Sequence, residues 1–199
     1  MKQRLCDPLP FHVTVDGQEI KIQPFFDNVL DVLSVFDDKS MTDEEKVMYA
    51  YCAFTGKKGK DFEQQVKIVQ CILDTIVFPD KKKQQKEQKA FDFLQDAPYI
   101  YAAYKQSYGI DLFEEQGRLH WWAFLFLFQG LPKNTRMMEI IKIRTEPMPK
   151  ATKHNAEYRK SLAKAKLSVA LEVPQEEREK NAHKALESFA QMIAKMAQQ

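Results

Sequence analysis

An eight-residue apolar run, from Trp121 to Phe128, constrains the fold of this chain more than any other feature of its sequence. Five of the eight residues are aromatic. A helix that crosses a bilayer needs about 20 apolar residues, so this run is too short to span a membrane. It must therefore be buried in protein, either in the core of the chain or against a partner. Gly130 and Pro132 follow it and are typical of a helix end. We expect a helix over 118–129, and a buried strand is the alternative.

The N-terminal region has the alternating pattern of a β-hairpin. Residues 11–22 alternate between apolar and polar side chains around Asp16-Gly17. Asp-Gly is the preferred pair for a two-residue type I′ turn. With these two residues as the loop, Val13 lies opposite Ile20. We predict a hairpin whose apolar face packs on the helices that follow, because an isolated hairpin is only marginally stable.

The rest of the first 149 residues has the apolar spacing and the end residues of helices. Helices are expected from Pro24 to Phe36, from a capping box at Thr42 and Glu45 to Gly56, from Asp61 to Pro79, from an Asp96 cap to Gly109, and from a cap at Asn134 or Thr135 to Ile143. The third is expected to bury Phe62, Val66, Val69, Leu73 and Ile76. Cys52 and Cys71 fall inside these helices and are expected to be buried.

Two prolines, Pro147 and Pro149, mark the predicted domain boundary. We expect a helical body with an N-terminal hairpin over 1–149 and a basic, amphipathic helical pair over 150–199. The pair carries 10 lysines and arginines against 6 acidic residues. Its narrow apolar seams are Tyr158, Leu162, Ala165 and Val169, then Ala182, Leu186, Phe189, Ile193 and Met196 with heptad-like steps. The predicted fold class is therefore mainly α, with an N-terminal β-hairpin, a helical core and a C-terminal helical pair.

No pattern of catalytic or metal-binding residues is present in the sequence. The four histidines are scattered, and none has a cysteine, histidine or carboxylate at metal-ligand spacing. The GKKGK segment at 56–60 lacks the spacing of a phosphate-binding loop. His120 is expected to cap the apolar helix rather than to act in an active site. We therefore expect no enzymatic activity, no cofactor and no metal.

The charge of the chain does not favour a nucleic-acid partner. The formal net charge is only +2, and the basic tract from Lys81 to Lys89 lacks the aromatic residues that stack on bases. Three widely spaced cysteines and the absence of an apolar segment after Met1 favour a reducing cytoplasm. A small nucleic-acid-binding or regulatory helical protein remains the alternative, with this tract and the basic C-terminal segment as its contacts.

The candidates for partner binding are large apolar side chains. Adjacent residues of a helix point about 100° apart, so Trp121 and Trp122 cannot both face the same side. One of them is a candidate contact, since tryptophan is enriched at interface hot spots, and core packing is the alternative for both. The full set of candidates is Trp121, Trp122, Tyr158, Leu162, Leu186, Phe189 and Ile193.

The sequence between Phe91 and Arg144 resembles a family of phage proteins of about this length. They are encoded in tail-morphogenesis clusters of long-tailed phages and prophages of Gram-positive bacteria, and are named after the fifteenth gene product of such a phage. The resemblance rests on FDFLQDAPYIYAAYKQSYGIDL, LHWWAFLFLFQGL and the ending Ile143-Arg144. The hairpin and the amphipathic helix after it are also similar, so the resemblance covers roughly 11–149.

The resemblance implies a role in tail assembly. Genes of the family lie near the tape-measure gene, where many phages encode a pair of chaperones that coat the hydrophobic tape-measure helix until tube subunits replace them. It thus implies a non-catalytic, chaperone-like protein in the cytoplasm of the bacterial host, absent from the mature virion. The implied partner is the tape-measure protein, and the further candidates are the tail tube protein, a companion chaperone and a second copy of the chain. A structural component of the virion is the alternative.

Overall fold

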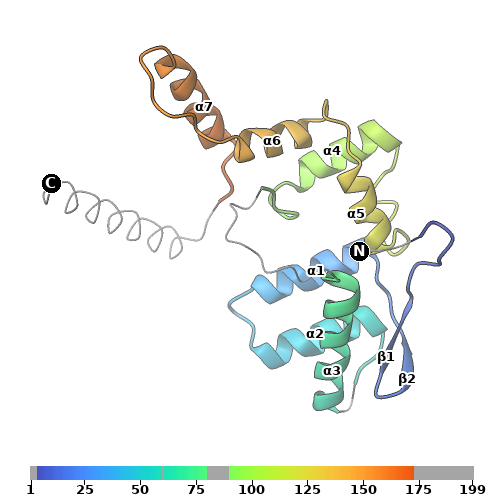
Figure 1. Ribbon diagram of the computed structural model, residues 1–199. Coiled ribbons are helices and arrows are strands. Elements are labelled where there is room, and N and C mark those ends of the chain that lie inside the picture. Colours follow the sequence, from blue (N-terminus) through green and yellow to red (C-terminus); the bar gives the residue numbers. More distant parts are fainter. Residues whose placement is uncertain (1–3, 60, 80–89, 173–199) are drawn as a thin grey trace, which may run out of the picture. The chain divides into compact units, whose positions relative to one another are not determined.

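The computed structural model describes residues 4–59, 61–79 and 90–172. These residues form seven α-helices, one π-helical turn and a two-stranded sheet (Figure 1). The chain divides into two compact units, Met1–Pro147 and Met148–Gln199. The prediction of a mainly helical fold with an N-terminal hairpin is confirmed.

The hairpin has the predicted turn and register. Strands β1 (His12–Val15) and β2 (Gln18–Lys21) are antiparallel, with Val13 opposite Ile20. Asp16 and Gly17 have φ values of 50° and 76°, the left-handed conformation that a type I′ turn requires at both positions. Val13 is buried, and β1 packs against the third helix, so the sheet is stabilised by a helix on its apolar face.

Three helices follow the hairpin: α1 (Phe26–Asp37), α2 (Asp43–Thr55) and α3 (Phe62–Ile72), which continues as the π-helical turn η1 (Leu73–Val77). The predicted capping box begins α2, because Thr42 accepts from the Glu45 N–H while the Glu45 carboxylate accepts from the Thr42 N–H. Gly56 ends α2 in the left-handed conformation, as predicted.

The buried face of α3 differs from the predicted one. Phe62 and Val66 are exposed, whereas Gln65, Ile68 and Ile72 are buried. The buried positions have helical spacing, three and four residues apart, but the first of them is a polar glutamine. The apolar residues alone therefore predicted a buried face that is rotated about the helix axis from the observed one. This prediction was wrong for Phe62 and Val66 and right for Val69 and Ile76.

Helices α4 (Ala97–Tyr108) and α6 (Arg136–Thr145) pack against each other in the first unit. Thr135 caps α6 by accepting from the Met138 N–H, as predicted, and Gly109 ends α4 in the left-handed conformation. Asp96 precedes α4, but its carboxylate makes no N-cap hydrogen bond. It pairs instead with Arg144 of α6 at 2.6 and 2.8 Å, and both side chains are buried.

The apolar run forms α5 (Trp121–Gln129), which packs against α1, α4 and η1. Trp121, Phe124 and Phe128 are buried, and only Phe126 of the run is exposed. The helix begins three residues later than predicted because residues 119–121 pair with the start of α1. Phe26 N donates to the Leu119 carbonyl at 3.0 Å, and Trp121 N donates to the Pro24 carbonyl at 2.7 Å.

His120 caps α5, as the sequence predicted. Its Nδ1 accepts from the Trp122 N–H at 3.0 Å, so its Nε2 carries the proton and donates to the Pro10 carbonyl at 3.0 Å. The ring is 3% exposed, and burial lowers the pKa of His120. The neutral imidazole is therefore the form that caps the helix.

We expect the first unit to lose stability as the pH falls below about 6.5, where an unfolded histidine takes up a proton. The folded chain binds this proton only at lower pH, because the pKa of His120 is lowered, so protonation favours the unfolded state. Urea unfolding at pH 7.5, 6.5 and 5.5 checks this. His120→Asn, which retains a capping oxygen, should flatten the dependence, while His12→Asn at an exposed position should not. An equal slope in wild type and His120→Asn would contradict the assignment.

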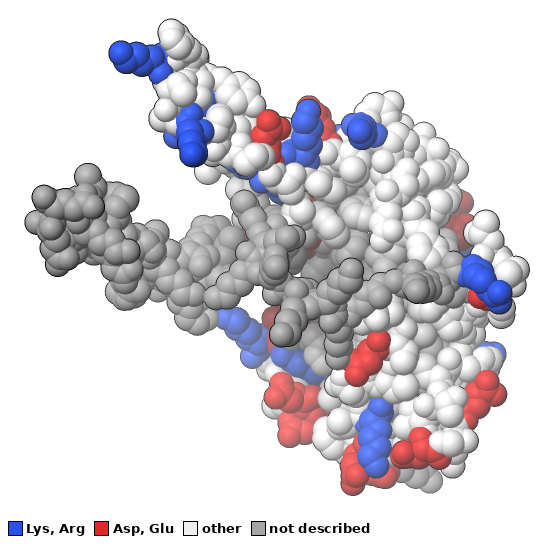
Figure 2. All heavy atoms as spheres, viewed as in Figure 1, with Lys and Arg blue, Asp and Glu red and all other residues white. Residues whose placement is uncertain are grey.

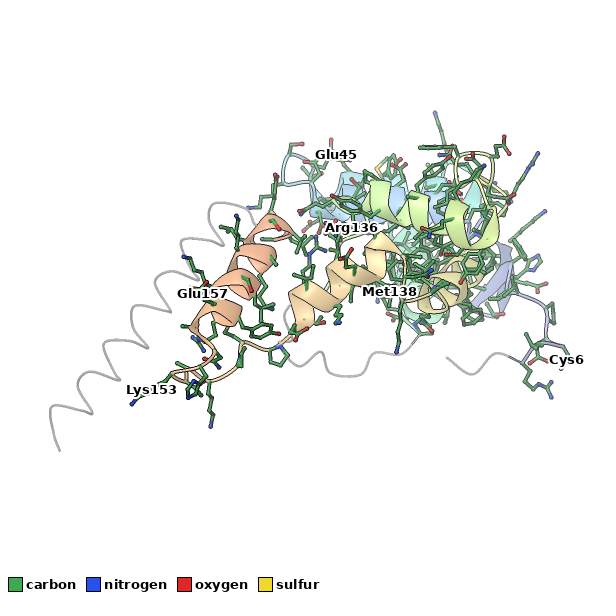
Figure 3. The ribbon with its side chains drawn as sticks, turned by 90° about the horizontal axis from the view of Figure 1, so that it is seen from above. Cys6, Glu45, Arg136, Met138, Lys153 and Glu157 are labelled. Atoms are coloured by element: carbon green, nitrogen blue, oxygen red, sulfur yellow. The ribbon has the colours of Figure 1, made fainter. Side chains whose placement is uncertain are left out.

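The three cysteines are free thiols. Cys6 and Cys52 are exposed, and Cys71 is half-buried (Figure 3 labels Cys6). The prediction that Cys52 is buried was wrong, because the face of α2 that carries Ala50 and Phe54 is the one turned to the core. Cys71 lies 3.9 Å from the Thr14 carbonyl of β1, near the hairpin.

The described part of the second unit contains α7 (Ala156–Ser168). Asn155 orders the turn before it, since its side chain accepts from the Thr152 N–H and donates to the Lys150 carbonyl. Arg159 donates to the Pro149 carbonyl. The second half of the predicted helical pair, after Pro174, lies outside the described residues.

Candidate docking site

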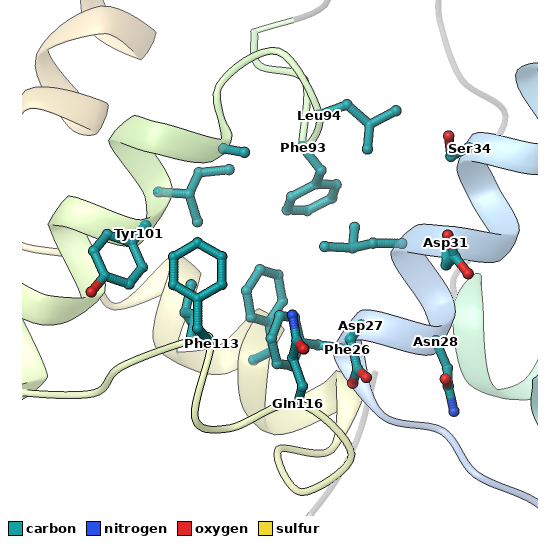
Figure 4. Close-up of a pocket in the computed structure, with 15 residues that line it drawn as sticks. Phe26, Asp27, Asn28, Asp31, Ser34, Phe93, Leu94, Tyr101, Phe113 and Gln116 are labelled. Carbon is teal, nitrogen blue, oxygen red and sulfur yellow. The ribbon is translucent and has the colours of Figure 1, made fainter.

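A pocket of about 490 Å³ opens in the first unit between α1, the segment before α4, and the loop that joins α4 to α5 (Figure 4). Buried apolar side chains from four parts of the chain form its base: Phe26 of α1, Ile100 of α4, Leu112 of the loop and Phe124 of α5. The pairing of residues 24–26 with 119–121 brings α1 and α5 together at this base. The pocket is therefore part of the core packing of the unit rather than a surface irregularity.

Two large apolar side chains remain exposed where the pocket opens. Leu94 is 51% exposed and Phe113 is 71% exposed, and both line the pocket. The Phe113 ring packs against Tyr101 with ring centroids 5.0 Å apart, and Figure 4 shows it rising from the loop beside the Tyr101 ring. The Tyr101 hydroxyl donates to Asp111 at 3.0 Å. Leaving these apolar side chains in water is unfavourable, so the opening is suited to an apolar partner.

The loop that carries Phe113 is fixed at both ends. Asp111 accepts from Tyr101 and pairs with Lys105 at 3.1 Å, and these two donors hold the pKa of the Asp111 carboxyl below its usual range. At the other end, both carboxylate oxygens of Asp27 accept from the Gly117 N–H at 3.1 Å. Phe113 is thus presented on an anchored loop.

The α1 side of the pocket carries four polar side chains beside the apolar Phe26 and Leu30. Asp27, Asn28, Asp31 and Ser34 line it, and Figure 4 shows them along one helix. Asp31 accepts a hydrogen bond from the Tyr49 hydroxyl of α2, and this bond raises the pKa of Tyr49. The site therefore combines an apolar base, an apolar edge and a carboxylate edge.

The predicted partner-binding residues lie elsewhere. Trp121 is buried and Trp122 is half-buried, and their indole N–H groups donate to the Val77 and Ile76 carbonyls at 3.5 and 2.8 Å. These bonds tie α5 to η1, so the two tryptophans have partners within the first unit, and neither lines the pocket.

The other candidates belong to the second unit. On α7, Tyr158 is exposed and Leu162 is buried. Leu186, Phe189 and Ile193 lie outside the described residues. The basic tract Lys81–Lys89 also lies outside the described residues. Over the first unit, the face drawn in Figure 2 carries side chains of both signs interspersed.

Sequence reasoning missed Leu94 and Phe113. A signal for Phe113 was present, because it is a large apolar residue in a short loop between Gly109 and Gly117, followed directly by two glutamates. A loop residue of this kind has no helical face on which to be buried, and loops of this kind often carry binding residues. Leu94 gave no such signal, since it stands next to residues that pack in the core.

Within the described ranges, no three histidine, cysteine or carboxylate side chains gather where they could hold a metal ion. None of the helices in these ranges is long and apolar enough to cross a membrane.

Fold and site together define a small, mainly helical protein with an open apolar pocket edged by carboxylates. The chain belongs to the family described as bacteriophage Gp15 protein, whose sequence profile matches residues 5–171. The match is longer than the roughly 11–149 of the resemblance and includes α7. Neither the curated proteins nor the solved structures contain a match to this chain.

Proposed function

We propose that this protein is a non-catalytic tail assembly factor that holds the tape-measure protein of its phage until the tail tube forms. The family gives the phage context. The tape-measure role was implied by the sequence resemblance, and the surface chemistry of the first unit supports it. A factor of this kind acts in the host cytoplasm and leaves before the particle is complete.

The exposed apolar pocket is the observation that carries the proposal. Phe113 and Leu94 stand in solvent around a pocket with a buried aromatic base, and a contiguous apolar surface of this kind marks an interaction site. A long apolar client needs such a surface, because its own helix would otherwise aggregate before assembly. A temporary holder needs only moderate affinity, which a single pocket on a small domain provides.

The second unit offers additional contacts. Tyr158 and Leu167 on α7 are 51% and 80% exposed, and the segment after Pro174 continues the heptad-like pattern. We assign Tyr158, with Leu186, Phe189 and Ile193, to self-association or to a second contact with the client, whereas Leu162 is buried. Trp122 is the tryptophan of the pair that retains some exposed surface for this purpose.

Co-expression with the tape-measure protein of the same phage should raise the soluble fraction of the tape measure, and the two should co-purify. The physical reason is that the pocket covers apolar client surface that otherwise drives aggregation. Quantitative mass spectrometry of purified virions should find none of this chain. An unrelated aggregation-prone helical protein, expressed in place of the tape measure, serves as the client control.

Two results would overturn the proposal. A tape-measure protein that stays insoluble and separate in the presence of this chain would remove the holding role. Stoichiometric amounts of the chain in washed particles would instead make it a structural component of the virion.

A further inference from the structure

Three of the four segments that line the pocket carry charged residues, all of them acidic, and the fourth, α5, carries none. Residues 26–37, 91–101 and 110–116 together carry eight aspartates and glutamates and no lysine, arginine or histidine. Among them, Asp96 pairs with Arg144 and Asp111 pairs with Lys105. These segments are therefore negative, although the whole chain carries a formal charge of +2.

Two of these carboxylates stand at the pocket itself. Asp27 and Asp31 are four residues apart, so they lie on the same face of α1, and both line the pocket. Their hydrogen-bond donors, the Gly117 N–H and the Tyr49 hydroxyl, are neutral groups and do not offset the negative charge. An occupant that covers the pocket thus meets two fixed carboxylates along one edge (Figure 4).

The opposite edge is apolar. Phe113 and Leu94 come from the loop and from the segment before α4, facing α1 across the pocket (Figure 4). The volume of about 490 Å³ is within the range of protein ligand sites, roughly 300–1,000 Å³. An occupant must therefore present large apolar groups to one edge and positive charge to the other.

We propose that this pocket, in the role given above, binds an amphipathic helical segment of the client with lysine or arginine beside its apolar face. Apolar side chains at helical spacing enter between Phe113 and Phe124, as in other helix-in-groove complexes. A lysine or arginine one turn away pairs with Asp27 or Asp31. Acidic segments and nucleic-acid phosphates are repelled from the same edge.

The proposal is tested with the full-length protein and fluorescent peptides in anisotropy titrations. The probes are an amphipathic leucine–lysine helix, the same helix with glutamate for lysine, and overlapping peptides of about 25 residues that cover the tape-measure sequence. The leucine–lysine helix should bind at least about tenfold more tightly than the leucine–glutamate helix, and its affinity should fall with added salt. Among the tape-measure peptides, the basic amphipathic ones should bind best.

Matched pairs of variants locate the binding. Phe113→Ser should weaken binding about tenfold or more, whereas Phe126→Ser, at an exposed phenylalanine outside the pocket, should not. Asp31→Asn should weaken binding of the leucine–lysine helix about two- to fivefold at low salt. Asp37→Asn, at the other end of α1, should leave this affinity unchanged. Because Phe113 and Asp31 are exposed, circular dichroism melts of these variants should match wild type.

The outcomes separate the site from the function. If tape-measure peptides bind wild type and Phe113→Ser equally, the pocket is not the site, although the holding role stands. If only the leucine–lysine helix binds, and binds at Phe113, the pocket chemistry is right and the tape-measure role is wrong. Equal affinity for the lysine and glutamate helices overturns the charge argument. A dimer in sedimentation that Phe113→Ser dissociates would make a second copy of the chain the occupant.

Discussion

Replacing Asp96 with asparagine should lower the free energy of unfolding of the first unit by about 3–5 kcal/mol. The Asp96 carboxylate takes two hydrogen bonds from the Arg144 guanidinium, at 2.6 and 2.8 Å, in a place where both side chains are at most 8% exposed. Without the carboxylate, the buried guanidinium loses both of these charged hydrogen bonds and retains the bond to the Ala90 carbonyl at 3.3 Å. The pair joins the start of α4 to the end of α6, so its loss weakens the packing of both helices.

Urea unfolding followed by circular dichroism measures this effect. Glu139→Gln is the matched control, since Arg136 and Glu139 also pair at 2.6 Å but both are more than half exposed. Exposed pairs contribute about 0–1 kcal/mol, so the control should change the unfolding free energy by less than about 1 kcal/mol. Similar losses in the two variants would mean that solvent reaches Asp96 and that the pair is not buried.

The features that could be predicted from the sequence depend on residues close together in the chain. The Asp16-Gly17 turn fixes its own register, because a two-residue loop allows one pairing of the flanking strands. The capping box of Thr42 and Glu45 is complete within four residues. Gly109 ends its helix through its own backbone conformation. Each of these is a local interaction, and local sequence determines it.

The features that could not be predicted depend on distant partners. Asp96 has the sequence position of an N-cap, but its carboxylate pairs instead with an arginine 48 residues away in the sequence. Gln65 of α3 is buried among aliphatic residues, although the sequence periodicity assigns this glutamine to the exposed face. The α5 start is set by pairing with residues 24–26, far earlier in the chain. Tertiary contacts determine these three features, and such contacts cannot be inferred from the local sequence pattern.

The candidate site shows the same division. The sequence indicated correctly that most of the apolar run packs within the chain, but it could not indicate that Trp121 and Trp122 donate to carbonyls at the end of η1. A π-helical turn leaves carbonyls without the usual helical donors, and two indoles supply donors there. The pocket was missed because four separate segments form it, and no short window of sequence contains more than one of its sides.

Phe124→Ala should destabilise the first unit by about 3–5 kcal/mol, the range for truncation of a buried aromatic side chain. Phe124 is 1% exposed and lies at the centre of a group of rings. Phe26, Tyr104 and Trp121 stack on it at centroid distances of 5.1, 5.2 and 5.6 Å, with interplanar angles below 20°. These rings come from α1, α4 and α5, so the truncation leaves a cavity where three helices meet.

Phe126→Ala provides the matched control two residues away on the same helix. Phe126 is 41% exposed and belongs to the same apolar run, so its truncation removes little buried area and should cost about 1 kcal/mol or less. Chemical unfolding of the two variants under identical conditions compares them directly. Domains of this size are stable by about 5–15 kcal/mol, so Phe124→Ala should remove a large share of that stability. An unchanged unfolding midpoint for Phe124→Ala, or an equal loss in both variants, would show that α5 does not pack as described and that the pocket lacks its aromatic base.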